Sequence, residues 1–143
     1  MNSNSVTRNT RWLAPLVAVL AATASCCSCA DPSDSRSVIQ DRVNAVRGHT
    51  VPADATALNS SGPTLRNYVA TANWEFETGS AKDVYLSWLS QQLERDDFKL
   101  KSSNESNLVF TKSSRDESES VSVQIAPSNE KLHVEVAYTL DSD

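Results

Sequence analysis

The second half of the chain is constrained most strongly by a period of two in its apolar residues. Between residues 68 and 76 every second side chain is apolar, which is the spacing of a β-strand that buries one face. Four more runs alternate in the same way, at residues 98–100, 108–110, 121–125 and 132–140. Short polar segments of hairpin character separate the later runs. We therefore expect an antiparallel sheet of about five strands.

One helix is expected to interrupt this series of strands. The segment Ser80-Ala81-Lys82-Asp83 fits a capping box with Asp in the reciprocal position, and the helix that it opens should end near Arg95. Six apolar residues recur at helical spacing along this segment: Ala81, Val84, Tyr85, Trp88, Leu89 and Leu93. The predicted fold class is α+β, in the order β-α-β-β-β-β with the helix packed on one face of the sheet. In outline this order resembles helix-grip-like domains, a likeness of fold that implies no function.

The first residues of the chain have the layout of an export signal. Residues 1–11 are polar and carry Arg8 and Arg11 without any acidic residue, and an apolar run follows at residues 12–25. A basic start, a short apolar core and a border of small residues are typical of a secretory signal peptide. A membrane-spanning helix needs about 20 apolar residues, whereas this run is shorter and contains Pro15. We assign residues 1–25 to a signal peptide.

The three cysteines of the chain all lie directly after this apolar run, between residues 26 and 29. A disulfide framework inside the folded domain is therefore excluded. The segment Thr23-Ala24-Ser25-Cys26 resembles the lipobox of bacterial lipoproteins, with Thr23 in the position where Leu is usual. This resemblance implies that Cys26, or alternatively Cys27, carries a lipid that anchors the chain to a membrane. Ordinary cleavage after Ala24 or Ala30, which would leave a secreted or periplasmic soluble protein, is the competing interpretation.

Between the signal and the sheet the sequence indicates a tether. Residues 31–37 are polar, and Ile39, Val43 and Val46 could form one face of a short helix that ends at Gly48. Residues 49–63 contain Pro52, Gly62 and many small polar side chains, which are typical of a loop. We accordingly expect a lipidated tether over residues 26–63 and a small α+β domain over residues 64–143.

The width of the expected sheet raises the question of what covers it. Five strands at about 4.8 Å spacing span roughly 19 Å, whereas one helix is only about 10–12 Å wide. The uncovered part of the apolar face must be closed by curvature of the sheet, by the helix around Val43, or by another molecule. This is the sequence's main indication of a protein partner, which would bind the incompletely covered sheet or its last strand.

Three groups of residues are candidates for chemistry. Trp74, Tyr85 and Trp88 could line a small-molecule pocket between helix and sheet, although aromatic side chains at such positions are more often plain core. His133 and Glu135 alternate on the polar face of a strand and could orient an imidazole or bind a metal; a solvated strand face is the simpler interpretation. The carboxylates of residues 116–119 lack the ligand spacing of a calcium loop, so a solvated turn is expected there.

Charge and motifs narrow the function classes. With 13 basic and 18 acidic residues and a pI near 5.0, the chain lacks the basic character of a nucleic-acid binder. Its sequence contains no phosphate loop, dinucleotide fingerprint or nucleophile elbow. We therefore expect a non-catalytic, membrane-anchored interaction module of the bacterial cell envelope, without metal or cofactor. A domain that binds or weakly turns over a small molecule is the alternative, and the oligomeric state is open.

Overall fold

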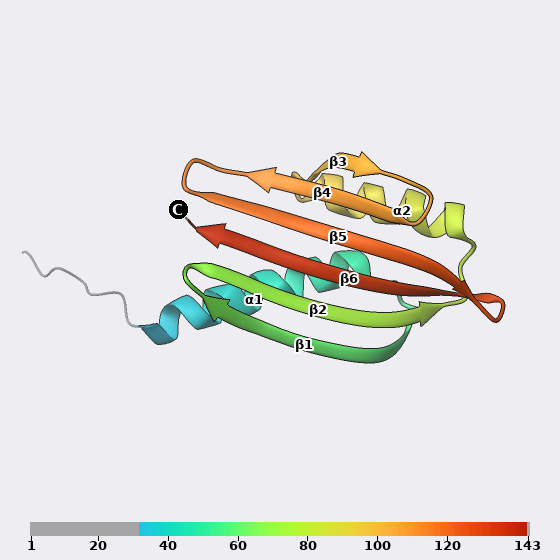
Figure 1. The fold of residues 1–143 in the computed structure, drawn as a ribbon, viewed down its shortest axis with the longest axis horizontal. Coiled ribbons are helices and arrows are strands. Elements are labelled where there is room, and N and C mark those ends of the chain that lie inside the picture. Colours follow the sequence, from blue (N-terminus) through green and yellow to red (C-terminus); the bar gives the residue numbers. More distant parts are fainter. Residues whose placement is uncertain (1–31, 143) are drawn as a thin grey trace, which may run out of the picture.

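A computed structural model describes residues 32–142, with side chains from Ser35 onward, as a six-stranded antiparallel sheet with two helices (Figure 1). The sheet order is β1-β2-β6-β5-β4-β3. In chain order the elements are α1 Pro32–Thr50, β1 Thr56–Arg66, β2 Val69–Thr78, α2 Lys82–Arg95, β3 Lys99–Ser103, β4 Asn107–Ser113, β5 Glu117–Ser128 and β6 Lys131–Ser142. The predicted signal peptide and the three cysteines lie outside the described residues. None of the described helices is long and apolar enough to cross a membrane.

The α+β class and the antiparallel sheet are confirmed, but the expected count of about five strands is wrong. The additional strand, β1, lies largely in the segment expected to be a loop, so the folded part extends back beyond the boundary set at residue 64. Every side chain of β1 except that of Pro63 is exposed, and its only partner in the sheet is β2. A strand with two open faces has no reason to alternate apolar and polar residues, and for that reason the pattern missed it.

Gly62 is required by the irregular path of β1. The register of β1 against β2 shifts between Ser61 and Thr64, and Gly62 has a φ of +95°. A Cβ atom at this position would stand 2.7 Å from the carbonyl oxygen of Thr71 on the neighbouring strand. Only glycine allows the two backbones to approach so closely.

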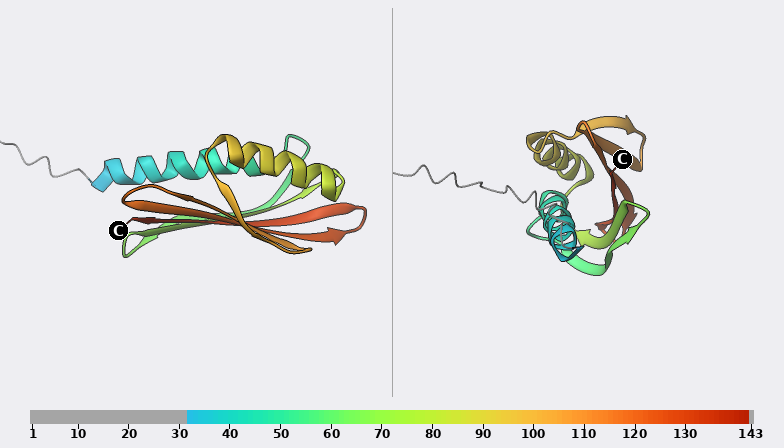
Figure 2. Two further views of the ribbon diagram at one scale, coloured as in Figure 1. Left: turned by 90° about the horizontal axis from the view of Figure 1, so that it is seen from above. Right: turned by 90° about the vertical axis from the view of Figure 1, so that its left-hand side faces the viewer.

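The short helix expected around Val43 is the second half of a helix of 19 residues, α1. Val43 and Val46 are buried, and Ile39 is partly buried against the same core. Both helices lie on one side of the sheet, which curves around them (Figure 2). Two of the three expected ways of closing the apolar face, the helix and the curvature, are therefore used within this chain.

The alternation predicted at residues 98–100 is wrong, because Phe98 is buried before β3 begins and all five residues of β3, Leu100 included, are exposed. The alternation predicted for β2, β4, β5 and β6 is confirmed. Their inward side chains form the core, which includes Ala70, Ala72, Trp74, Phe76, Leu108, Phe110, Val121, Val123, Ile125, Leu132, Val134, Val136, Tyr138 and Leu140. Tyr68 departs from the prediction, because it lies in the β1–β2 turn and is 79% exposed. The last strand, β6, lies in the interior of the sheet between β2 and β5. It therefore cannot accept a partner strand along its edge.

The helix expected after Ser80 is confirmed, and it ends at Arg95 as predicted. Its capping box is wrong: the N-cap residue is Ala81, and no side chain caps the helix. The Ser80 side chain instead approaches Asp54 at 3.5 Å. Tyr85, Leu89 and Leu93 are the buried residues of α2, whereas Val84 is exposed.

Thr50, the last residue of α1, joins both helices to the sheet. Its side chain is fully buried, and its Oγ1 accepts a hydrogen bond from Trp74 Nε1 on β2 at 3.0 Å. The same hydroxyl donates to the carbonyl oxygen of Val46 at 3.1 Å. The Thr50 carbonyl oxygen accepts from Tyr85 Oη on α2 at 2.9 Å. Three elements therefore meet at one residue.

We expect Thr50→Val to lower the free energy of unfolding by about 1–3 kcal/mol, because it keeps the shape of the side chain but leaves the buried Trp74 N–H without an acceptor. Chemical denaturation monitored by tryptophan fluorescence would measure the loss. Thr71→Val, on the exposed face of β2, is the matched control and should be close to neutral. Equal stability of the two variants would contradict the role given to Thr50.

Candidate functional site

One part of the helix-covered face of the sheet is charged rather than apolar. Along β5 the inward positions Val121 and Val123 are fully buried, and the same alternation continues back to Glu119 and Glu117. The two carboxylates therefore occupy positions where the rest of the strand supplies core. Figure 2 shows α2 over the opposite half of the domain, so α1 alone lies over this half.

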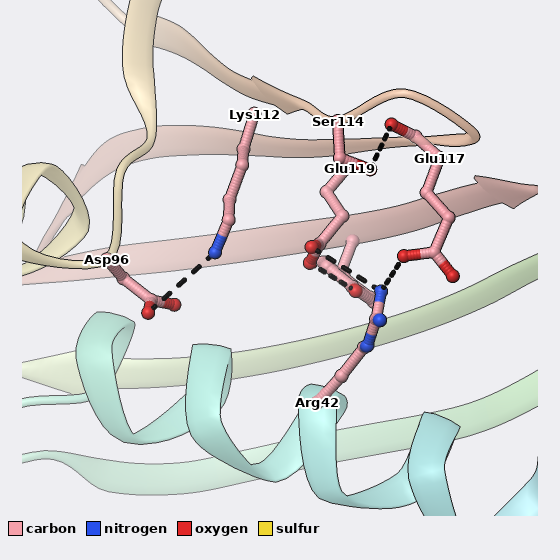
Figure 3. Close-up of polar contacts among 7 residues, drawn as sticks. Arg42, Asp96, Lys112, Ser114, Glu117 and Glu119 are labelled. Atoms are coloured by element: carbon pink, nitrogen blue, oxygen red, sulfur yellow. Dashed lines mark hydrogen bonds and ion pairs between the residues drawn. The ribbon is translucent and has the colours of Figure 1, made fainter.

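Arg42 of α1 reaches across to both carboxylates (Figure 3). Its Nη1 lies 2.6 Å from Glu117 Oε2 and 3.7 Å from Glu119 Oε1. Glu119 Oε2 also accepts a hydrogen bond from Tyr138 Oη at 2.7 Å. The side chains of Arg42 and Glu117 are 34% and 36% exposed, whereas that of Glu119 is 12% exposed. The outer pair can therefore exchange with solvent, while Glu119 is largely enclosed.

A second set of charges lies on the other side of the same hollow. Lys112 Nζ on β4 lies 3.9 Å from Asp96 Oδ1, just after α2. His49 Nδ1 lies 3.7 Å from Asp96 Oδ2, which is too long for a hydrogen bond, and this nitrogen is buried without a hydrogen-bond partner. Together the two sets enclose a hollow of about 350 Å³, which we call the charged cleft. Its lining residues are Arg42, Ala45, Val46, Asp96, Lys112, Ser114, Glu117 and Glu119.

The protonation states in the cleft follow from burial and from these contacts. Burial raises the pKa of Tyr138 well above its usual range, and the hydrogen bond to the Glu119 carboxylate raises it further. The hydrogen bond to Glu117 raises the pKa of Arg42. Tyr138 is therefore a neutral donor at physiological pH, and Arg42 is a permanent cation. The cleft presents both signs of charge, and that is a property suited to recognition.

The charged cleft includes residues that were expected to lie in a solvated turn. Glu117 and Glu119 lie in β5, not in the turn that precedes it. Among the residues that the structure describes, no group of three or more His, Cys, Asp or Glu is arranged to hold a metal ion. The sequence could have placed Glu117 and Glu119 on the inward face of the strand, because they continue the alternation of Val121 and Val123. Arg42 is next to Val43 on the helix and one turn before Val46, but nothing in the sequence pairs it with β5.

The predicted His133 and Glu135 pair is formed on the opposite, outer face of the sheet. Their side chains approach to 3.3 Å, from His133 Nε2 to Glu135 Oε1. They border a hollow of about 390 Å³ whose other lining residues are the polar Asn104, Ser106, Asn107 and Gln124 and the apolar Ile125, Ala126 and Pro127. The glutamate is about half exposed, so the pair is a feature of the solvated face.

The predicted aromatic group lies in the core between the helices and the sheet. Trp74 and Tyr85 are 3% and 1% exposed, and the polar atom of each binds Thr50. Trp88 is only partly buried and lies 6.0 Å from the Tyr85 ring, between ring centroids. A ligand would have to displace core packing to reach the first two side chains. Their role in ligand binding stays a prediction.

Alkaline unfolding tests the buried tyrosines. Burial raises the pKa of Tyr85 and of Tyr138 in the folded chain, whereas an unfolded tyrosine ionises near pH 10. Above about pH 10 the unfolded state therefore loses protons that the folded state keeps, and stability falls by about 1.4 kcal/mol per pH unit for each buried tyrosine. We expect Tyr138→Phe to reduce this slope, measured by urea denaturation between pH 9 and 11. A slope unchanged by the substitution would contradict the protonated donor.

Comparison with known proteins assigns no family to this chain. No protein-family model matches it, and no curated protein matches its sequence. Among solved structures the fold is similar to the crystal structure of LpqN, described as involved in cell envelope biogenesis of Mycobacterium tuberculosis. The TM-score is 0.40, with 13% sequence identity over 65% of this chain and 69% of that one. A likeness of this size carries no functional conclusion.

Proposed function

We propose that this protein is an exported lipoprotein of the bacterial cell envelope, anchored through Cys26 or Cys27, and that its domain is a non-catalytic protein-interaction module. The observation that carries the proposal is the charged cleft, in which charges stand at core positions of β5 and remain open to a partner. The proposed export and membrane anchoring rest on the predicted signal peptide and the lipobox resemblance.

Stability alone is a poor reason for keeping these charges. Ion pairs that are a third exposed contribute only about 0–1 kcal/mol, and packed apolar side chains stabilise a core position at least as well as charged ones. Charges arranged in complementary sets instead give an interface its specificity and its association rate. The cleft is therefore better explained by binding than by folding.

The two edges of the sheet are less suited to binding than the cleft. Within β1, Pro63 and two register irregularities interrupt the pairing pattern, and β3 has only five residues with Lys99 and Lys101 among them. Proline, bulges, lysine and short length are the features that protect edge strands from pairing with other chains. A partner is therefore expected to bind by side-chain contacts rather than by adding a strand.

The chemistry of the partner follows from the cleft walls. Lys112 on one wall would pair with an acidic side chain, and Glu117, which is partly exposed and bound to Arg42, would be shared between Arg42 and a basic side chain of the partner. A protein segment that carries both signs of charge meets these requirements. Catalysis is not part of the proposal, because Arg42 and Tyr138 already engage the carboxylates. The hydroxyl of Ser114, which also lines the cleft, donates to the backbone carbonyl oxygen of Glu117 at 3.4 Å.

Cross-linking in intact envelopes tests the interaction. With a tagged full-length chain, mass spectrometry should find one recurrent protein attached to residues around the charged cleft. Lys112→Gln should reduce that cross-link several-fold while changing stability by no more than about 1 kcal/mol. Lys101→Gln, on the exposed edge strand β3, is the matched control and should leave it intact. Cross-links only to other copies of the chain, or a yield unaffected by Lys112→Gln, would count against the proposal and direct attention to a small ligand near Trp88.

Fractionation tests the anchor. Replacing Cys26 and Cys27 together by alanine should move the protein from the membrane fraction to the soluble one, because neither candidate position for lipid attachment would then carry a thiol. The single variants would show which of the two cysteines carries it, and Cys29→Ala is the control. Unchanged membrane association of the double variant would rule out the lipid anchor.

A further inference from the structure

The turn between β1 and β2 exposes more apolar surface than a hairpin turn needs. Tyr68 is 79% exposed and Leu65 is 48% exposed. Arg66 and Asn67 lie between them and are exposed too. We call residues 65–68 the hairpin tip. An aromatic ring left almost wholly in water at the end of a hairpin contributes little to folding, and together with Leu65 it gives the tip an apolar surface that the core does not use.

The second two-residue turn of the sheet provides an internal comparison. Asn67 and Tyr68 have φ angles of 47° and 66°, and Asn129 and Glu130 in the β5–β6 turn have φ angles of 44° and 67°. Both are turns with two left-handed residues, which usually favour Asn or Gly. The same backbone therefore accepts a charged residue in one turn and carries tyrosine in the other. The turn geometry does not dictate the tyrosine.

The two turns lie at opposite ends of the domain. In the pairing of β2 with β6, Val69 faces Asp141 at one end and Thr78 faces Leu132 at the other, next to the β5–β6 turn. The N-terminal half of α1 lies at the hairpin-tip end, where Arg36, Ile39 and Gln40 share a hollow of about 490 Å³ with residues 62–65 of β1. Figure 1 shows α1 beginning at the same end as the β1–β2 turn. The tyrosine is therefore at the end where the chain enters the domain.

The length of chain before α1 limits how far this end can be from an anchor. Cys26 precedes Pro32 by six positions, and six residues span at most about 20 Å when fully extended. We infer that the hairpin tip rests on the lipid surface to which the N-terminal lipid anchors the chain, with Tyr68 at the headgroup level. This inference depends on the lipid anchor of the proposed function and adds an orientation of the domain to it.

The chemistry of the tip suits a lipid interface. Tyrosine is enriched at membrane–water interfaces because its ring is apolar and its hydroxyl is polar. Arg66, two positions before Tyr68 in sequence, and Arg36, which lines the hollow, can approach lipid phosphates. The acidic charge of the whole chain opposes electrostatic docking, but a contact made by one aromatic ring and two arginines is local. The lipid chains hold the protein, and the tip orients it.

Depth-dependent fluorescence quenching tests the orientation in the full-length, lipidated chain. The same genetically encoded fluorescent amino acid is placed at position 68 in one chain and at position 130 in another, and each is incorporated into vesicles of phosphatidylethanolamine and phosphatidylglycerol that contain a lipid-borne quencher. We expect quenching at position 68 to exceed that at position 130 several-fold. Equal quenching at the two positions, in chains that float with the vesicles, would overturn the inference and leave the anchor intact.

A substitution tests whether the Tyr68 ring itself, and not only the closeness of the hairpin tip to the lipid anchor, brings the tip to the lipid surface. With the fluorescent residue at position 65, Tyr68→Glu should reduce quenching by at least half, and Glu130→Tyr should leave it unchanged. Because glutamate already occupies the matching position of the β5–β6 turn, the variant is expected to fold. Quenching unaffected by Tyr68→Glu would overturn the role of the ring. Failure of the chains to float with vesicles would refute the anchor and the orientation together, and protection of position 68 in native envelopes but not in vesicles would assign the tip to a protein partner.

Discussion

The arrangement of this domain depends on the hydrogen bonds of Thr50. Its hydroxyl accepts from Trp74 of β2, and its carbonyl oxygen accepts from Tyr85 of α2. Because Thr50 ends α1, these two bonds fix the C-terminal end of that helix against the sheet and against the second helix. The rest of α1 then extends over the half of the sheet that α2 does not cover, and Arg42 is carried to a position opposite β5.

The unequal cover of the two helices explains why one strand changes character along its length. Val121 and Val123 of β5 are fully buried, whereas Glu119 and Glu117, earlier in the same strand and on the same face, bind Arg42. A single helix leaves space there that apolar side chains would expose to water. Charged side chains can occupy such space, because they are partly hydrated and paired at once. The 14 residues of α2 thus leave room for the charged cleft, whereas the charges that line it are better explained by binding.

The sequence predicted those elements whose burial is one-sided. In strands such as β6, with Val134 and Val136 facing the core, apolar and polar residues alternate because successive side chains contact either the core or water. The strand β1 is exposed on both faces, so its composition is typical of a loop. It forms a strand because it pairs with the edge of β2. The charged cleft was missed for a related reason: Arg42 and Glu117 are 75 positions apart, and only the packing of α1 brings them together.

The cleft and the hairpin tip lie at the same end of the domain. Glu117 pairs with Ser142 in the sheet, and Val69, directly after the tip, pairs with Asp141. If the chain is held by a lipid at Cys26, a partner in the cleft must therefore bind close to the membrane surface rather than far out in the surrounding space. This favours a partner that is itself membrane-associated, or one whose charged segment lies near the bilayer. With a lipid at Cys26, the short chain between that residue and α1 would limit not only where the domain can be, but also what can reach the charged cleft.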